Sequence, residues 1–400
     1  MAAAFRSIGI DATVAPDSDA ETLELGGLYA SGEECLPHKI TLGDFLKVCR
    51  APDFDPARTA FFMPSARGPC RFGQYTPYLK QVLAELGYAD VPVISPLSEN
   101  GYDGIGDHAG DLMRTGWMAV VCGDLAQRFL LKTRPYETTP GDTDDAFLQS
   151  VADFERVVDR PELTPKQRLS GLLAAVGRMR DRFRAVPARY EKGRPLIGLV
   201  GEIFCRLNVF SNGDVARRIE KHGGECWISD IAEWVWYTNW SHKTDLLRQR
   251  GWFNTDYLKL KLKTRAQHHY EQALLTPVQK DLVGYEEPHD IVQVLEASRP
   301  FLPPEGCLGE MVLSVGKTIY LHGKGADGII DISPFTCMNG VVCEAVYPAV
   351  SAAHGDLPIR NLYFDGAATN VDRDLDIFLD LARAYQGRKR CRRVYPAYFN

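Results

Sequence analysis

Short apolar segments alternate with longer segments of helical periodicity along most of this chain, and this alternation constrains the fold more than any other feature of the sequence. Apolar strands separated by amphipathic helices are typical of parallel sheets that carry helices on both faces. The segments that we expect to form strands are 8–14, 59–63, 91–95, 195–201, 225–229, 327–333 and 362–365. The segments that we expect to form helices between them are 35–49, 72–87, 108–130, 308–323, 339–350 and 373–385. The pattern therefore predicts an α/β fold.

The expected strands form two groups, which predicts two parallel-sheet domains of the flavodoxin-like or Rossmann-like type. The first domain covers residues 1–140 and the second covers residues 193–390. Residues 141–192 are charged and helical in pattern, so we interpret them as a helical connector. Residues 231–300 begin with many Trp and Tyr residues and then become helical, which indicates a helical insertion in the second domain.

The sequence also predicts local structure at the two ends of the chain. Residues 2–9 have the pattern of the last turns of a helix that leads into the first strand. A βα unit that would normally precede this strand is therefore expected to be missing or to come from another chain. The tail at residues 388–393 is basic, and we interpret it as a solvated end rather than a binding patch.

Composition and charge exclude several classes of function. The 400 residues carry a formal net charge of −6, which argues against a nucleic-acid-binding protein because such proteins usually present a basic face. An apolar run of about 18 residues is absent from the sequence, so no transmembrane helix is expected. The apolar stretch at the N-terminus is too short and too weakly apolar for a secretory signal, so a cytoplasmic location is the default expectation. The P-loop pattern and a GxGxxG that follows a strand are also absent, so the chain itself is not expected to bind a nucleotide.

The ten cysteines of the chain point to chemistry other than disulfide bonds. Thiols stay reduced in the cytosol, so a disulfide framework is not expected without a secretory signal. The sequence has no CxxC pair, which removes the usual zinc-ribbon and thioredoxin patterns. Any metal site must therefore be assembled by the fold from distant segments.

Three of these cysteines, Cys35, Cys70 and Cys337, lie in the same kind of loop, one that enters a predicted helix. The helix dipole and the free backbone N–H groups at such a position favour a thiolate, and they can also point at the sulfides of an anionic iron–sulfur cluster. Our hypothesis is that the three thiolates hold one cluster, with an open or non-cysteine position on the remaining iron of a [4Fe-4S] cubane. Structural zinc is the alternative, although zinc more often takes four protein ligands. The roles of Cys205 and Cys343 stay open, because either could be a packed core thiol.

Polar residues beside these loops are candidates for binding and catalysis. Arg67 and Arg71 flank Cys70 and could donate hydrogen bonds to cluster sulfides. Glu202, Arg206 and Asn208 follow the strand at 195–201, and ligands of open parallel sheets bind beyond the carboxyl ends of strands. These three residues either orient a substrate or partner as catalytic residues, or form a structural salt bridge.

Several longer motifs resemble one known superfamily. They are Glu34-Cys35-Leu-Pro, Gly68-Pro-Cys70-Arg-Phe-Gly-Gln-Tyr, Pro334-Phe-Thr-Cys337-Met, Gly201-Glu-Ile-Phe-Cys-Arg-Leu-Asn-Val-Phe-Ser-Asn, Gly123-Asp-Leu with Thr133-Arg-Pro-Tyr-Glu, and Tyr363-Phe-Asp-Gly. Together they resemble the 2-hydroxyacyl-CoA dehydratase and benzoyl-CoA reductase superfamily, above all its branch of uncharacterised proteins related to CoA-enzyme activases. The resemblance covers nearly the whole chain.

The resemblance implies a low-potential iron–sulfur protein of tandem flavodoxin-like domains, with the cluster between the domains on Cys35, Cys70 and Cys337. It implies a homodimer or heterodimer that receives electrons from a separate ATP-hydrolysing activator with its own cluster. Those electrons would serve a reduction or the radical dehydration of a substrate such as a CoA ester. Two alternatives are a double-cubane cluster reductase of small molecules and a non-catalytic electron-transfer or assembly subunit.

Overall fold

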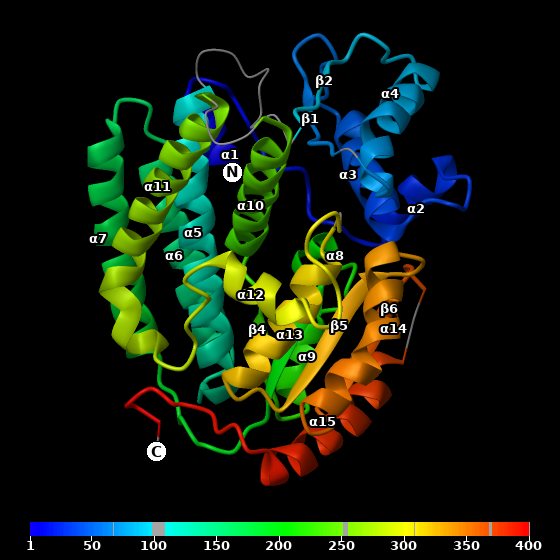
Figure 1. The fold of residues 1–400 in the computed structure, drawn as a ribbon. Helices are drawn as coiled ribbons and strands as arrows, with labels where there is room; N and C mark the ends of the chain where they lie inside the picture. Colours follow the sequence, from blue (N-terminus) through cyan, green and yellow to red (C-terminus); the bar gives the residue numbers. More distant parts are fainter. Residues whose placement is uncertain (67, 98–108, 251–254, 308, 368–369, 400) are drawn as a thin grey trace.

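The computed structural model describes residues 1–66, 68–97, 109–250, 255–307, 309–367 and 370–399. Within these residues the protein is a mixed α/β structure with two parallel sheets, one of two strands and one of four strands (Figure 1). The prediction of an α/β fold with parallel sheets is confirmed in this form.

The larger sheet lies at the centre of the second half of the chain. Its strands are β3 (Leu196–Gly201), β4 (Glu225–Ile228), β5 (Gly328–Pro334) and β6 (Ile359–Phe364). They are arranged in the order β4-β3-β5-β6, and all neighbouring pairs are parallel. Strands β3, β4 and β5 are buried along their whole length, which explains why they appear in the sequence as largely apolar runs, with Glu225 and Asp331 as buried exceptions.

Helices cover both faces of this sheet. Alternate residues of β3 show this, because Leu196 and Val200 pack in a core with α5 and α13, whereas Ile197 and Leu199 pack in a core with α9 and α15. The bounds of these helices are α5 (Ala109–Thr133), α13 (Met311–Gly323), α9 (Val215–Lys221) and α15 (Val371–Arg388). Two further helices, α8 (Ile203–Leu207) and α14 (Met338–Ala353), begin close to the carboxyl ends of β3 and β5.

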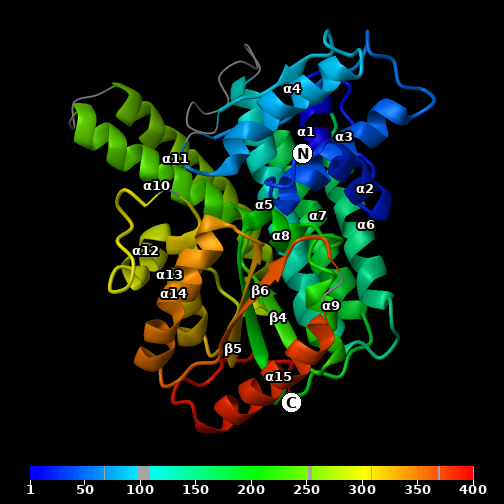
Figure 2. The same cartoon turned by 90° about the vertical axis from the view of Figure 1, so that its right-hand side faces the viewer.

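The first part of the chain forms a smaller unit with its own core. Its sheet consists of β1 (Phe61–Phe62) and β2 (Val93–Ile94), and its helices are α2 (Ala20–Tyr29), α3 (Leu36–Arg50), η1 (Arg71–Gln74) and α4 (Tyr75–Glu85). In the described residues this sheet has two strands of two residues each, which is much less than the sheet of a complete flavodoxin-like domain. The view in Figure 2 shows this unit above the carboxyl ends of the larger sheet.

The predicted strand at 8–14 is wrong. The chain begins with helix α1 (Ala2–Arg6), and residues 10–19 have no regular structure. The apolar residues Ile10 and Val14 are exposed, and no strand in the described residues pairs with this segment. Arg6 instead holds the segment through its hydrogen bond to the carbonyl oxygen of Ala12. A segment with a strand-like alternation of apolar residues does not form a stable strand when no neighbouring strand pairs with it.

The two helical regions predicted at 141–192 and 231–300 are present. They comprise α6 (Asp142–Val158), α7 (Pro165–Ala185), α10 (Ile231–Arg250), α11 (Thr255–Leu275), η5 (Thr276–Leu282) and α12 (Ile291–Ser298), and the short η4 (Arg134–Tyr136) precedes α6. Helices α6 and α7 pack along α5 and share its core, which Phe129, Phe154 and Leu172 illustrate. The connector is therefore part of a helical layer and not a spacer (Figure 1).

The tail at 388–393 is not a wholly solvated end. Lys389 and Arg393 turn inward, and each forms a buried ion pair, with Asp327 and Glu225 respectively. Arg390 and Arg392 are exposed, as expected. The basic tail therefore packs against the end of the larger sheet at which β4 and β5 begin.

The described residues contain no helix that is both long and apolar enough to pass through a membrane.

Candidate functional site

Cys35, Cys70 and Cys337 each occupy the residue directly before a helix. Cys35 is the N-cap of α3, Cys70 is the N-cap of η1, and Cys337 is the N-cap of α14. The sequence prediction that all three lie at helix entrances is confirmed. Cys70 is exposed, and Cys35 and Cys337 are partly exposed, as are Cys307 and Cys391, whereas the other five cysteines are buried.

Direct contacts join the loops that carry these cysteines. The guanidinium Nη1 of Arg71 donates a hydrogen bond to the hydroxyl of Thr336 over 3.1 Å, although the two residues are 265 positions apart. This contact links the residue after Cys70 to the residue before Cys337. Cys35 Sγ lies 3.0 Å from the hydroxyl of Tyr75, the first residue of α4, which follows Cys70 and η1 in the chain. The fold therefore brings three remote segments to one region.

The packing of α2 and α3 explains how Cys35 reaches this region. Leu36 and Ile40 on α3 belong to the same core as Leu362 and Phe364 of β6, which fixes the start of α3 at the carboxyl end of the larger sheet. Helix α2, which the sequence analysis missed, supports α3 at very short range. A Cβ atom at Gly26 of α2 would lie 1.9 Å from the carbonyl oxygen of Lys39, so only glycine allows this approach.

The backbone is strained beside Cys337. Thr336 has a φ of +64°, a left-handed conformation that costs a β-branched residue about 1–3 kcal/mol. Strain of this kind persists where the surrounding structure holds it in place, and it concentrates at functional sites. Here the Arg71 hydrogen bond and the β5–α14 connection hold it.

A position at a helix entrance is expected to lower the pKa of a thiol, but the pKa values of the free thiols of Cys70 and Cys337 are raised. Burial raises the pKa of the Cys337 thiol to about 12, against the opposing effect of the Asn339 and Gly340 N–H groups. Desolvation by nearby groups also raises the pKa of Cys70, although part of its surface is exposed, and the Phe72 N–H opposes this rise. The helix N–H groups thus act in the expected direction, but desolvation is the larger effect. Metal binding at these residues would release their protons.

Two carboxylates interact with both of these cysteines. Glu202 and Glu310 each contribute to the raised thiol pKa of Cys70 and of Cys337. The charge of Cys35 also contributes to the raised pKa of Cys70. These charge interactions connect Cys70 with Cys35, Glu202 and Glu310, and Cys337 with Glu202 and Glu310.

The structure places the three predicted catalytic residues around helix α8. Glu202 caps this helix, since its carboxylate accepts hydrogen bonds from the N–H groups of Phe204 and Cys205 at 3.0 and 2.8 Å. Arg206 is buried and donates to the carbonyl oxygens of Gly201 and Ser229.

Asn208 is the third, and it holds a loop together. Its amide nitrogen donates to the Ser18 hydroxyl, and its side-chain oxygen accepts from the Ser211 N–H. The side-chain nitrogens of Arg206 and Asn208 therefore form hydrogen bonds within the protein.

The sequence analysis missed Glu310. This buried carboxylate accepts a hydrogen bond from the N–H of Ile203 at 2.8 Å, so it lies at the start of the same helix that Glu202 caps. Burial and the nearby charge of Glu202 raise its pKa well above the ordinary value. The sequence carries no local signal for this role, because Glu310 lies within the helix predicted at 308–323, whereas in the structure it directly precedes α13 and follows Gly309, whose φ is +130°.

Cys35, Cys70 and Cys337 supply thiols, the donor type that holds iron–sulfur clusters. In the described parts of the chain, no group of three or more His, Cys, Asp or Glu side chains is arranged to hold one metal ion. Arg71 lies next to Cys70 as predicted, whereas Arg67 is outside the described residues.

Comparison of the chain with models of known protein families and with curated proteins finds no match in either set.

Proposed function

We propose that this protein binds an iron–sulfur cluster on Cys35, Cys70 and Cys337, and that it accepts low-potential electrons from a separate ATP-hydrolysing activator. The observation that carries the proposal is the arrangement of the three cysteines. Each is the N-cap of a different helix, and the contact between Arg71 and Thr336 joins two of their loops. Free N–H groups at such helix ends stabilise an anionic group.

The bound cluster would supply one-electron transfer. The residues of the chain would bind and shield it. The Phe72 N–H lies 3.5 Å from the Cys70 sulfur, and the N–H groups of Asn339 and Gly340 oppose the rise in the pKa of the Cys337 thiol; all three would favour thiolates. Tyr75 lies at hydrogen-bond distance from Cys35 and is buried, so it would keep water away from one side of the site.

The electrons would serve a reduction or a radical dehydration, and a CoA ester is the substrate class that the motif resemblance favours. We also propose that the chain works in the cytoplasm, as a homodimer or heterodimer, and that its two sheets represent the two flavodoxin-like domains of that superfamily. The resemblance of the cysteine motifs supports these points.

Cys70→Ala tests the ligand assignment. The protein is purified without oxygen, and its iron and acid-labile sulfide are measured per chain. We expect the parent protein to hold both in near-equal amounts, and Cys70→Ala to lose most of its iron. Cys49→Ala is the matched control, because Cys49 is a buried core cysteine of the same unit and should keep the full iron content.

Full iron retention in Cys70→Ala would overturn the ligand assignment, and zinc in place of iron in the parent protein would overturn the redox function. Turnover of acyl-CoA esters with an activator then separates an enzyme from an electron carrier.

A further inference from the structure

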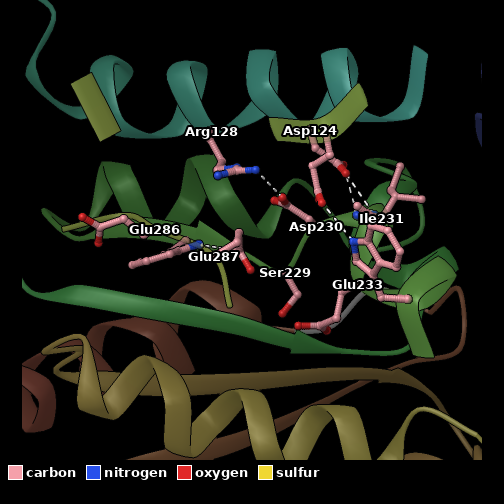
Figure 3. A network of polar contacts seen from close by, with 12 residues as sticks. Asp124, Arg128, Ser229, Asp230, Ile231, Glu233, Glu286 and Glu287 are labelled. Atoms are coloured by element: carbon pink, nitrogen blue, oxygen red, sulfur yellow. Dashed lines mark hydrogen bonds and ion pairs between the residues drawn. The ribbon is translucent and has the colours of Figure 1, made fainter. Parts of the chain in front are cut away.

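The four-stranded sheet has two outermost strands, β4 and β6, and their outer sides differ. All four residues of β4 are buried, and Trp227 of this strand shares a core with Phe129 of α5. Helix α5 also holds the segment that follows β4, because Arg128 donates to Asp230 over 2.6 Å and Asp124 accepts hydrogen bonds from the first N–H groups of α10 (Figure 3). Strand β4 is therefore enclosed by the chain itself.

The outer side of β6 is open. In the parallel pairing of β5 with β6, the N–H of Phe335, directly after β5, donates to the carbonyl oxygen of Phe364. Alternate residues of a strand turn their backbone groups to the same side, so Ile359, Asn361 and Tyr363 turn theirs away from β5. These backbone groups form no hydrogen bond within the described part of the chain. Such a strand is a template for a further strand.

Helices α14 and α15 lie beside β6 on opposite faces of the sheet. The side chains of Leu362 and Phe364 pack in the core that contains α15. Tyr363 points to the opposite face, where its hydroxyl donates to Glu344 of α14 over 2.6 Å. On the same face as Tyr363, the side-chain nitrogen of Asn361 is buried without a hydrogen-bond partner among the described residues. The open strand thus lies between two helices.

Both helices expose apolar side chains on the side next to β6. On α14, Val341 lies three residues before Glu344 and therefore on the same side of the helix. On α15, Asp374 is the residue that pairs with β6, and Ile377 and Leu381 follow it by three and seven residues. Val341, Ile377 and Leu381 are each 55% exposed. Apolar surface therefore accompanies the open strand on both faces of the sheet, which is typical of a surface that contacts another molecule.

The charges on this face indicate which molecule covers it. The charged side chains Glu344, Arg360 and Arg388 each have a partner within the chain. Two copies that each carry a formal net charge of −6 repel one another, so a contact between them needs a face without unpaired charge. Permanent homodimers use apolar surfaces, whereas transient electron-transfer contacts are small and are guided by complementary charge. A second copy of the chain therefore fits this face better than an electron donor.

We propose that two copies of this chain pair through β6 in antiparallel orientation, so that their two four-stranded sheets become one continuous sheet. The open strand is self-complementary. With Asn361 opposite the Asn361 of the second copy, Ile359 of each copy faces Tyr363 of the other. Pairs of an aromatic and a β-branched residue stabilise antiparallel sheets. The same two-fold axis packs α14 against α14 and α15 against α15 of the second copy, which covers the exposed apolar side chains of both helices.

This inference rests on the proposed function only for the expectation of a dimer, for which it names the partner and the face. The cluster takes no part in the pairing. Because the two strands run antiparallel, the cysteine sites lie at opposite ends of the joined sheet. Each copy can therefore meet its own electron donor.

The first test measures the mass of the cluster-free protein in solution by sedimentation. We expect the parent protein to have twice the 44.6 kDa of one chain. Leu381→Glu places a negative charge from each copy at the contact, and we expect its dimer to be weaker by at least about 30-fold in dissociation constant. Leu148→Glu is the matched control, because Leu148 is 62% exposed but lies on α6, and its dimer should keep the strength of the parent dimer.

The second test locates the contact by hydrogen exchange. The amides of Ile359, Asn361 and Tyr363 should exchange slowly in the parent dimer and faster in the Leu381→Glu monomer. The amides of Leu362 and Phe364 face β5 and should stay protected in both proteins.

The outcomes separate this inference from the iron–sulfur function. A parent protein that stays monomeric well above micromolar concentration overturns the pairing, as does a dimer that Leu381→Glu leaves intact. A dimer in which the three outer amides exchange as fast as in the monomer overturns the pairing through β6. If Leu381→Glu does not fold, Val341→Glu decides by the same measurements. Iron in a monomeric protein leaves the iron–sulfur function standing, whereas a dimer without iron leaves the β6 pairing standing.

Discussion

Buried carboxyl groups are compensated differently at the two ends of the strands of the four-stranded sheet, which we call its two edges. At the edge where β4 and β5 begin, each buried carboxylate has its own cation. Glu225 pairs with Arg393, and Asp327 pairs with Lys389. At the edge where the strands end, seven carboxyl groups share the three cations Arg128, Arg206 and Lys317. The carboxyl groups are those of Asp124, Glu202, Asp230, Glu233, Glu287, Glu310 and Asp331.

The first edge holds paired charges, and the second edge holds a surplus of carboxyl groups. A buried ion pair with complete partners resists change, since removal of either member leaves an uncompensated charge. A surplus of carboxyl groups leaves protons that can be gained and lost, and perturbed groups of this kind cluster at functional sites. The cysteines lie at the second edge, so the electrostatics and the sulfur chemistry point to the same end of the sheet.

The largest expected effect comes from breaking a pair at the first edge. Arg393→Met leaves Glu225 fully buried without its cation, and we expect the free energy of unfolding to fall by about 3–5 kcal/mol. Denaturant unfolding at pH 7 measures this. Arg392→Met is the control, because Arg392 is exposed and its loss should change stability by less than about 0.5 kcal/mol. Equal effects from both variants would contradict the structural role of the first edge.

A smaller effect is expected from one carboxyl group of the second edge. Burial raises the pKa of Asp331 to about 6, from 3.8. The folded state therefore keeps this proton up to about pH 6, whereas the unfolded state loses it near pH 4, so stability decreases as pH rises between these values. The contribution is on the order of 3 kcal/mol.

Asp331→Asn should remove this part of the pH dependence, and urea unfolding at pH 4, 5, 6 and 7 measures it. The exposed Asp380 is the control position, and Asp380→Asn should keep the slope of the parent protein. A parent protein whose stability does not decrease between pH 4 and pH 6 would contradict the surplus of protonated carboxyl groups.

The smallest effect concerns the contact that joins the two cysteine loops. The hydrogen bond from Arg71 to Thr336 is exposed, so its coupling free energy should be about 0.5–1 kcal/mol. A double-mutant cycle with Arg71→Ala and Thr336→Ala measures this coupling by denaturant unfolding. No coupling would mean that the two loops meet without depending on this bond.

Local patterns predicted much of the fold. The helices predicted at 35–49 and 373–385 closely match α3 and α15, because a helix that buries one face shows its period in the sequence. Helix α2 was missed although Asp19 and Thr22 form a capping box at its start, since its apolar periodicity is weak. The segment 8–14 had a strand-like pattern but no partner strand, and pairing is not visible in local sequence.

Some features of the candidate site could also be predicted from the sequence, and others could not. The positions of Cys35, Cys70 and Cys337 before helices could be predicted from local signals. The buried position of Glu310 could not, because it depends on the contact with Ile203, 107 residues away.

The sequence by itself determined where most helices and strands lie and which thiols stand at helix starts, because hydrophobic period and helix entry are properties of neighbouring residues. Only the tertiary structure decided which charges are buried and how they are balanced. Arg393 belongs to a basic tail that looks solvated, yet it meets Glu225 across 168 residues. The energy of a charge in a protein depends on the groups around it in space, and those groups come from distant parts of the chain.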